Sequence, residues 1–485
     1  MSIMSNQANH KKEHCKKAIT FKQLIPYEIE MEQIIAQNPP VGFVYKFDFF
    51  IYLVNLTISI PMRNNDLLDS DGFVPFSSKL LQKKERNYDK HLKYLVQNGI
   101  LDEYPGFVPN KKCRKYRISK KYLSNKLKAV EIKAKALIEE PEIDFRTARK
   151  YEYLYQWFNS NIQVDMQKAI VEILEEIKPK LRENYYETYI NAYSSIMKLQ
   201  NIQDEQFWFK TDDFGNRLHT NFTNLNGKIK KYISYGNEQL VSIDLKNSQP
   251  YISLYLVKKF YENLQTSNPF QTQQATPTLN NKPSLSIILV NQPKTNTSID
   301  FQRFENLVCT GAFYKEFERE IRAKIGDDYF TREYIYDHDK GRPVKNTFTP
   351  KEIVKKDIFT VYFSKNKSKP KVKELFAELF PTVAFAFENM KQPKSWNDED
   401  SHKNLAKRLQ RMESHIMLDL VAKELARDYP DLPIFTIHDS IVTTAGHEYM
   451  VEEAMERIFT SQIGYKPTLT IEYWCKECQG HKMAA

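Results

Sequence analysis

The sequence predicts an α+β protein, because two short apolar runs are typical of buried strands and longer segments have helical periodicity. The runs at 240–243 and 434–437 are rich in β-branched residues and are bounded by polar residues or proline. Asp244 directly follows the first run, and Asp439 lies just beyond the second. The segment 401–428 repeats apolar residues every three or four positions, which predicts a helix leading into the second strand. Strands and helices in this mixture favour the α+β class.

The two aspartates are the first candidates for a functional site. A carboxylate at the end of a buried strand loses hydration, which is unfavourable unless a counter-charge compensates for it. A divalent metal ion is a common compensating charge. If the two strands lie side by side, Asp244 and Asp439 would hold two Mg²⁺ ions between them, as in two-metal phosphoryl transfer.

The composition narrows the class of protein. The chain has 485 residues, enough for two to four domains, and 41% of them are hydrophobic. Its 71 Lys and Arg against 61 Asp and Glu give a net charge of +10, which suits a polyanionic partner. No apolar run approaches the length of a membrane span, and the start does not read as a secretory signal. Since five cysteines fit a reducing compartment, we expect a cytoplasmic protein without a membrane partner.

Changes in composition divide the chain into four predicted parts. Residues 1–40 form a polar arm, 41–125 a small domain, 126–204 a helical connector or thumb, and 205–485 the part with both aspartates. The stretch 264–300 is rich in Gln, Thr, Asn and Pro and lacks periodicity. We therefore expect a flexible insertion there.

The small domain at 41–125 has the pattern of a winged-helix-like module. A helix predicted for 79–99 ends at Asn98-Gly99 and is followed by two short strands, 100–101 and 114–118. The second strand lies in a stretch of nine basic residues without an acid, between 111 and 128. The candidates for contact with nucleic-acid phosphates are Lys112, Arg114, Lys115 and Arg117. The alternative is a solvated basic surface that joins two domains.

Four blocks in the second half of the chain occur in a characteristic order. The first includes Arg217-Leu218 and Asn224-Leu225, and the second begins at Asp244 and continues to Ser248-Gln249. The third has Lys351, Lys355, Phe359 and Phe363 at intervals of four residues, which places them on one face of a helix. The fourth is His438-Asp439-Ser440. In this order the chain resembles the family A DNA polymerases and the single-subunit RNA polymerases over residues 205–470.

The resemblance implies a right-hand polymerase fold with palm, fingers and thumb. It implies that Asp244 and Asp439 are catalytic and bind two Mg²⁺ ions, which Mn²⁺ could replace, and that Lys355 meets the triphosphate. Phe359 would stack near the incoming base, on a nucleotide-binding face that includes Lys351 and Phe363. The residues implied to contact nucleic acid are Arg217, Asn224, Gln410 and His438.

Three positions of the third block depart from the family pattern. Lys351 replaces an arginine, Phe363 a tyrosine and Ser364 a glycine. The family tyrosine helps to judge the sugar, so the choice between deoxyribose and ribose stays open. Ser440 and the spacing of Ser248 are closer to the RNA enzymes.

The C-terminal end offers half of a zinc site. Cys475, Cys478 and His481 have ligand-like spacing, but the sequence does not indicate a fourth ligand. Reduced surface thiols are the alternative interpretation.

The function predicted from these patterns is template-directed nucleotidyl transfer. We expect a DNA polymerase that extends a primer 3′-hydroxyl during replication of a bacterial or mobile-element genome, with a DNA template–primer and nucleoside triphosphates as partners. The first alternative is an RNA-synthesising or primase-like polymerase of the same fold, with RNA as a partner. The second is a non-catalytic winged-helix replication initiator.

Overall fold

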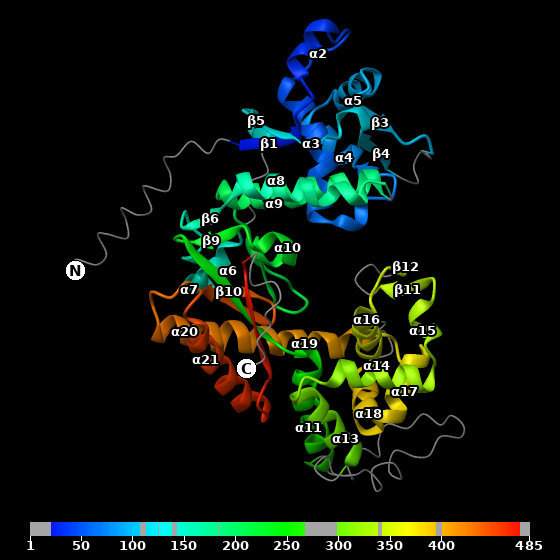
Figure 1. Cartoon of the computed structure of the whole chain (residues 1–485), viewed down its shortest axis with the longest axis vertical. Helices are drawn as coiled ribbons and strands as arrows, with labels where there is room; N and C mark the ends of the chain where they lie inside the picture. The colour runs from blue at the N-terminus through cyan, green and yellow to red at the C-terminus, as the bar shows by residue number, and fades with distance from the viewer. Residues whose placement is uncertain are drawn as a thin grey trace, which may run out of the picture. The chain divides into compact units, whose positions relative to one another are not determined.

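The structure is a computed structural model. It describes residues 21–106, 113–124, 126–137, 143–182, 184–266, 298–337, 342–393 and 400–475 (Figure 1). The chain divides into two compact units. The first contains Met1–Pro141, Val164–Gln206 and Leu225–Tyr232, and the second contains Glu142–Gln163, Phe207–Asn224 and Ile233–Ala485. None of the described helices is both long enough and apolar enough to cross a membrane.

Helix α3 (Phe47–Arg63) forms the core of the first unit, since nearly all of its residues are buried. Helix α9 (Tyr185–Gln203) packs against it, and the Ser194 hydroxyl donates to the carbonyl of Ile58 at 3.2 Å. The other helices of this unit are α2 (Met31–Gln37), α4 (Ser78–Lys84), α5 (Tyr88–Gln97), α8 (Met166–Ile177) and α10 (Gly227–Lys230).

Two antiparallel sheets complete the first unit. Strand β1 (Phe21–Pro26) pairs with β5 (Leu127–Ile132). The second sheet has the order β2 (Val74–Phe76), β4 (Arg114–Ile118), β3 (Leu101–Glu103).

Three predicted boundaries differ from the structure. The helix expected over 79–99 is two helices, α4 and α5, because the Glu85 carboxylate accepts the Asn87 N–H at 3.0 Å and turns the chain. The described half of the predicted polar arm contains β1 and α2. The segment 126–204 is divided between the two units. Its residues 142–163 belong to the second unit, where the N–H of Asp144 donates to the carbonyl of Phe209 at 3.0 Å.

A six-stranded sheet organises the second unit. Its order is β13 (Phe435–Ile437), β14 (Ser440–Thr444), β10 (Glu238–Leu245), β9 (Ile233–Tyr235), β6 (Ile162–Val164), and β15 (Leu469–Tyr473) also pairs with β10. Strand β10 runs antiparallel to β14, to β15 and to β9. Both predicted apolar strands are therefore present, and they share one sheet.

Some helices of the second unit pack against this sheet, and others pack on one another through phenylalanine side chains. The helix predicted for 401–428 is present as α19 (Asn404–Ser414), a π-helical stretch (His415–Ala422) and α20 (Lys423–Asp428). The ends of the predicted insertion, 264–300, belong to α11 and α13, and residues 267–297 lie outside the described residues. The remaining helices of this unit are α6 (Phe145–Lys150), α7 (Glu152–Tyr155), α11 (Ser248–Thr266), α13 (Ile299–Cys309), α14 (Phe313–Lys324), α15 (Asp328–Thr331), α16 (Pro350–Phe363), α17 (Lys371–Leu379), α18 (Pro381–Met390) and α21 (Glu448–Ile463).

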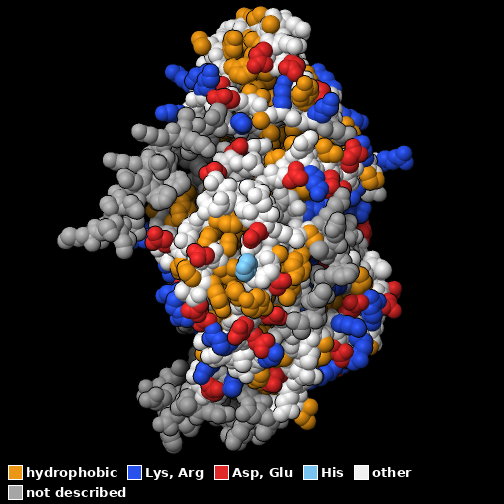
Figure 2. All heavy atoms as spheres, turned by 60° about the vertical axis from the view of Figure 1, so that its left-hand side comes forward, with side chains coloured by type: hydrophobic (Ala, Val, Ile, Leu, Met, Phe, Trp, Pro, Cys, Tyr) orange, Lys and Arg blue, Asp and Glu red, His pale blue; other side chains and the backbone are white. Residues whose placement is uncertain are grey.

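Two further antiparallel pairs belong to the second unit. They are β7 (Phe209–Thr211) with β8 (Leu218–Thr220), and β11 (Tyr334–Asp337) with β12 (Arg342–Lys345). Figure 2 shows acidic and basic side chains interspersed over one face of the chain. The net positive charge is thus not gathered into a single patch on that face.

Candidate active site

The sheet of the second unit places one candidate aspartate on a strand and the other in the turn that leads into the neighbouring strand. Asp244 is opposite Ser440 in the antiparallel pair of β10 and β14. Asp439 lies in the tight turn between β13 and β14, and its carbonyl accepts the N–H of Leu245 at 3.1 Å. His438, the other residue of this turn, has a φ of 53°. The turn therefore holds Asp439 beside the end of β10.

The donor groups at this position fit a magnesium site. Both carboxylates are half-buried, and the Ser440 hydroxyl donates to the Asp244 carboxylate. Mg²⁺ prefers oxygen ligands and is commonly bound by one or two carboxylates together with substrate phosphates and water. Within the described ranges, no group of three or more His, Cys, Asp or Glu side chains could hold a metal ion. Two carboxylates supply only part of a Mg²⁺ coordination shell, so substrate oxygens and water would have to complete it.

Glu413 is a buried charge that the sequence patterns did not single out. It lies on α19 with no exposed side-chain surface, and its Oε1 accepts the Nε and Nη2 of Arg217 at 2.9 and 2.6 Å. Its Oε2 accepts Ser248 Oγ at 3.1 Å and Gln249 Nε2 at 2.6 Å. Burial and the Asp439 carboxylate raise the pKa of Glu413, while Arg217 lowers it. The signal in the sequence was an acid four residues after Leu409, within the apolar stripe of the helix.

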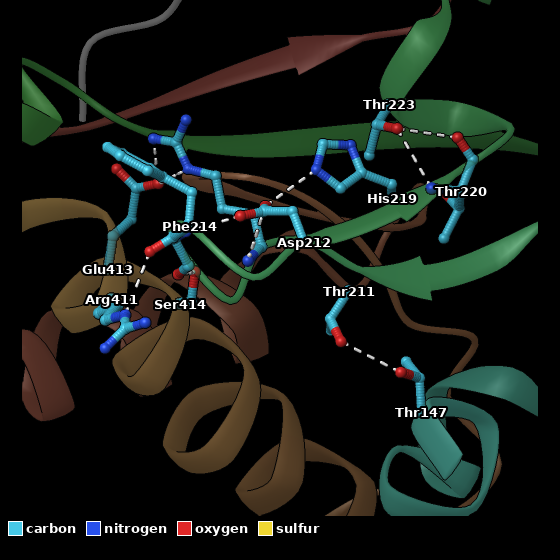
Figure 3. A network of polar contacts seen from close by, with 12 residues as sticks. Thr147, Thr211, Asp212, Phe214, His219, Thr220, Thr223, Arg411, Glu413 and Ser414 are labelled. Atoms are coloured by element: carbon cyan, nitrogen blue, oxygen red, sulfur yellow. Dashed lines mark hydrogen bonds and ion pairs between the residues drawn. The ribbon is translucent and has the colours of Figure 1, made fainter. Parts of the chain in front are cut away.

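The turn between β7 and β8 is fixed on α19 (Figure 3). Arg411 donates to the carbonyls of Phe214 and Asp213, both at 3.1 Å, and the Ser414 hydroxyl donates to the carbonyl of Gly215 at 2.9 Å. These bonds place Arg217, at the end of the turn, beside Glu413.

Gly215 allows Gln410 to pack closely on this turn. A Cβ atom at Gly215 would lie 2.5 Å from Gln410 Oε1. Any larger residue would therefore displace the Gln410 side chain or the turn. The structure thus places Gln410 against the turn that ends at Arg217.

Two histidines are in contact near the turn that carries Asp439. His219 Nε2 is 3.0 Å from Asp212 Oδ2 (Figure 3). The rings of His219 and His438 meet edge to face with centroids 5.6 Å apart. Burial, followed by Arg217 and His219, lowers the pKa of His438 to about 4, so its imidazole is neutral at neutral pH. Burial would raise the pKa of Asp212, but hydrogen bonds from Gly215 and His219 outweigh it and leave this pKa below its usual range.

The four residues predicted to share a face of α16 do share it. Lys351 and Lys355 are exposed, and Phe359 and Phe363 are partly exposed. The two phenyl rings stack with centroids 5.5 Å apart, and Lys355 Nζ lies 6.0 Å from the Phe359 centroid. Thr349 and Glu352 form a reciprocal cap that starts the helix before this face begins.

The tyrosine nearest to the family position is not on this face. Tyr362, next to Phe363, is fully buried, and its hydroxyl lies 3.2 Å from Ser253 Oγ. A different phenol, Tyr314 of α14, is near the aspartates, since burial and the Asp439 carboxylate raise its pKa. No pattern in the sequence pointed to Tyr314.

Asn224 is the last of the residues predicted to contact nucleic acid in this unit. It is exposed at the end of the short 3₁₀ helix Phe222–Asn224, which follows β8.

The basic residues predicted to form the wing have acidic partners within the first unit. Lys112 lies outside the described residues. The ion pairs join Arg114 to Asp89 at 3.3 Å, Lys115 to Asp69 at 2.8 Å and Arg117 to Asp102 at 3.0 Å. The expected acid-free basic strand is therefore largely neutralised by acids from other parts of the sequence.

The sequence left open whether the C-terminal cysteines bind zinc or are reduced surface thiols. Cys475 is disulfide-bonded, which fits neither interpretation, because a disulfide sulfur is neither a thiolate ligand nor a free thiol. Cys478 and His481 lie outside the described residues.

Comparisons with known proteins give weak likenesses to solved structures and no match to a family model or a curated protein. Among solved structures, the chain is similar to the POL domain of Pol1 from M. smegmatis, a structure in complex with DNA primer-template and dNTP, with 10% sequence identity and a TM-score of 0.30. The likeness covers 64% of this chain and 56% of that chain, so it spans about half of the known structure.

Proposed function

We propose that the chain is a template-directed nucleotidyltransferase, most simply a DNA polymerase that extends a primer 3′-hydroxyl. The observation that carries the proposal is that the turn between β13 and β14 brings Asp439 beside Asp244, at the end of β10 in the same sheet. The same unit contains a helix face with two lysines and two stacked phenyl rings. Paired carboxylates and a cationic, aromatic face are the two components that nucleotidyl transfer needs.

The carboxylates of Asp244 and Asp439 would hold Mg²⁺, or Mn²⁺ in its place. The bound ions would lower the pKa of the primer 3′-hydroxyl and stabilise the leaving pyrophosphate. The chain's own contribution is orientation, because Ser440 fixes the Asp244 carboxylate and the tight turn fixes Asp439.

The side chains around the aspartates would bind the substrates. Lys355 and Lys351 would meet the triphosphate as charges, and Phe359 would stack on the incoming base. Arg217 has its guanidinium held by Glu413, so it presents a fixed donor to the template–primer.

The proposal also gives roles to the other residues of the second unit that were predicted to contact nucleic acid or nucleotide. Gln410 and Asn224 would contact the template–primer beside Arg217. His438 would lie next to the primer terminus as a neutral imidazole, and Phe363 would border the nucleotide. In a right-hand arrangement the sheet would form the palm and α13 to α18 the fingers.

The first unit would bind nucleic acid through a winged-helix-like module made of α4, α5 and the sheet of β2, β4 and β3. Because Arg114, Lys115 and Arg117 are ion-paired, we place the main contact on Lys90 of α5 and on Arg86, in the turn before the helix. Both side chains are exposed, whereas Lys93, further along α5, pairs with Asp89 at 2.9 Å.

A polymerase that uses ribonucleotides is the second candidate, and one contact favours it. Ser440 donates to Asp244, and the family pattern associates a serine after the second aspartate with RNA synthesis. Phe363 has no hydroxyl with which to judge the sugar, and Tyr314 is the phenol near Asp439.

Primer extension with Mg²⁺ tests the proposal. Purified chain is given a DNA template with and without a primer, and either deoxyribonucleotides or ribonucleotides. We expect primer-dependent incorporation of deoxyribonucleotides, and a fall of roughly a thousandfold or more in Asp439→Asn and in Asp244→Asn. Asp431→Asn, an exposed acid of the same unit, is the matched control and should keep the parent rate.

Three outcomes would change the conclusion. Incorporation of ribonucleotides without a primer would establish the primase-like alternative. Binding of nucleic acid with no incorporation on any template would favour the non-catalytic initiator. An Asp439→Asn variant with the parent rate would show that the paired aspartates are not the catalytic centre.

A further inference from the structure

The loop after α16 presents four exposed lysines that sequence reasoning did not select. Residues 364–371 read Ser-Lys-Asn-Lys-Ser-Lys-Pro-Lys, and Lys365, Lys367, Lys369 and Lys371 are all exposed. No ion pair joins any of the four to an acid within the described ranges, where the nearby Asp400 is paired with Lys403 at 2.9 Å. The loop is therefore a concentrated positive surface whose lysines form no ion pair with a described acid, although Lys403 and, more weakly, Lys365 lower the pKa of the exposed Asp400 carboxyl.

Two buried lysines hold the backbone of this loop from inside. Lys373 Nζ donates to the carbonyls of Lys365, Asn366 and Ser368 at 3.1, 3.3 and 3.3 Å, which uses all three hydrogens of its ammonium group. Lys373 is only 8% exposed, so these bonds must compensate for its lost hydration. The carbonyls of the loop thus face the protein while its odd-numbered lysines face solvent.

The second buried lysine fixes the start of the loop. Lys391, 2% exposed, donates from Nζ to the carbonyls of Val361 and Ser364 at 2.9 and 3.3 Å. These carbonyls belong to the end of α16, so the loop continues rigidly from the helix that carries Phe359 and Phe363. Asn366 adds a bond from its side-chain amide to the carbonyl of Glu388 at 2.8 Å.

The combination of cations and exposed aromatic rings indicates the kind of partner. Proteins that bind single-stranded nucleic acid pair a positive track for the phosphates with aromatic side chains on which unpaired bases stack. Phe363, on the last turn of α16, immediately precedes the four lysines, and its ring is partly exposed. A duplex would leave the aromatic surface unused, because its bases are already stacked on one another.

We propose that the loop 364–371 and Phe363 bind a single strand of nucleic acid, with phosphates on the lysines and a base on the ring. Building on the proposed function, this strand is the unpaired template ahead of the site of synthesis. The binding itself does not require synthesis, so the two proposals can fail separately.

Binding measurements on the full chain test the proposal. Fluorescence anisotropy with a labelled single-stranded oligonucleotide, without Mg²⁺ or nucleotides, compares the parent with the variant Lys365→Gln, Lys367→Gln, Lys369→Gln, Lys371→Gln. We expect binding weaker by roughly tenfold to a hundredfold at about 50 mM salt. The slope of log K against log salt should flatten by up to about 3, or about 0.7 for each phosphate that the variant no longer neutralises.

The matched control removes the same charge elsewhere in the second unit. Lys259, Lys324, Lys423 and Lys466 are exposed, and the first, second and fourth of them pair with acids. Replacing these four with glutamine should change the slope by less than about 0.7, the value for one phosphate. An equal loss of affinity in both variants would overturn the proposal, because the loss would then follow from the lower net charge of the protein and not from the loop.

A second measurement tests the position of the strand. The parent should bind a primer–template with a 5′ overhang of about ten nucleotides more tightly than one with a single unpaired nucleotide. The loop variant and Phe363→Ala should lose most of this difference, while the control variant should keep it. If the loop variant retains the full gain from the overhang, the loop does not bind the unpaired strand, whatever the outcome of primer extension.

Discussion

The two compact units each have a segment rich in basic residues, and the two segments differ in their ion pairing. In the first unit, the basic strand β4 contributes Arg114, Lys115 and Arg117, and each has an acid within ion-pair distance. In the second unit, four lysines of the loop 364–371 form no ion pair with a described acid, although Lys365 acts on the pKa of Asp400 more weakly than Lys403 does. A run of basic residues can therefore be neutralised in the fold or left exposed. Which of the two occurs depends on whether acids from elsewhere in the chain fold against it.

The ion pair of Arg217 and Glu413 in the second unit is buried more deeply than the pairs of the basic strand in the first. Lys115 and Asp69 are 34% and 29% exposed, and pairs of this kind contribute at most about 1 kcal/mol each. Glu413 is 0% exposed and Arg217 22%. Removing one partner of a buried pair is far more destabilising, because the other charge stays in place without compensation.

Truncation of Glu413 should give the largest effect. Glu413→Ala leaves Arg217 without its carboxylate and removes the acceptor of Ser248 and Gln249, so we expect a loss of about 3 to 5 kcal/mol in the free energy of unfolding. Urea denaturation followed by tryptophan fluorescence measures it. All four tryptophans of the chain fall in the second unit, so this signal reports that unit.

Glu413→Gln is the control variant, because it keeps the shape of the side chain and removes its charge. The amide keeps one oxygen acceptor near Arg217, so its loss of stability should be smaller than that of the alanine variant. Synthesis should fall in both variants, and the loss in the glutamine variant should be the smaller of the two. Equal stability of parent and alanine variant would mean that this pair behaves like the exposed pairs of the first unit.

The sequence predicted the parts of the site that depend on local spacing. The strands that precede Asp244 and Asp439 follow from short β-branched apolar runs with polar or proline boundaries. The shared face of Lys351, Lys355, Phe359 and Phe363 follows from their spacing of four residues. Local spacing also located the long helix before β13.

The missed features depend on contacts between distant segments. Glu413 reads as one acid on an amphipathic helix until the fold brings Arg217 to it from 196 positions away. The partners of the basic strand lie up to 46 positions away, at Asp69, and no pattern around Lys115 indicates them. Pairing of this kind is a tertiary property, so a count of charges in a window cannot detect it.

The buried lysines of the second unit make a prediction about pH. Burial, together with the Lys373 ammonium, lowers the pKa of Lys391 to about 7, with Glu388 acting in the opposite direction. Between this pKa and the ordinary lysine pKa, the unfolded chain binds a proton that the folded chain does not, so the free energy of unfolding should rise with pH. From about pH 7 to about pH 9 we expect a gain on the order of 1 to 2 kcal/mol from this group.

Lys391→Met isolates this contribution, because methionine fills a similar space without a titrating group. Urea denaturation at both pH values, followed by tryptophan fluorescence, should show a larger gain in the parent than in the variant. The variant will be less stable at both values, since it leaves the carbonyls of Val361 and Ser364 without their donor. Parallel pH dependence in the two proteins would mean that Lys391 stays protonated in the folded chain throughout this range.

The smallest expected effect comes from removing the acids of the first unit. Asp69→Asn with Asp102→Asn releases Lys115 and Arg117 while Oδ1 of residue 69 can still accept the N–H of Phe73, a bond of 2.8 Å in the parent. The free energy of unfolding should change by less than about 1 kcal/mol.

Affinity of this double variant for duplex DNA, measured by anisotropy at about 50 mM salt, should rise a few-fold, because each released cation can neutralise a phosphate. The slope of log K against log salt should steepen by at most about 2, and Asp66→Asn with Asp71→Asn, which removes equal charge from neighbouring acids, should change it less. If the double variant binds no better than this control, the basic strand does not contact nucleic acid even when its cations are released. The basic strand and the loop 364–371 would then differ in their location on the chain's surface as well as in their ion pairing.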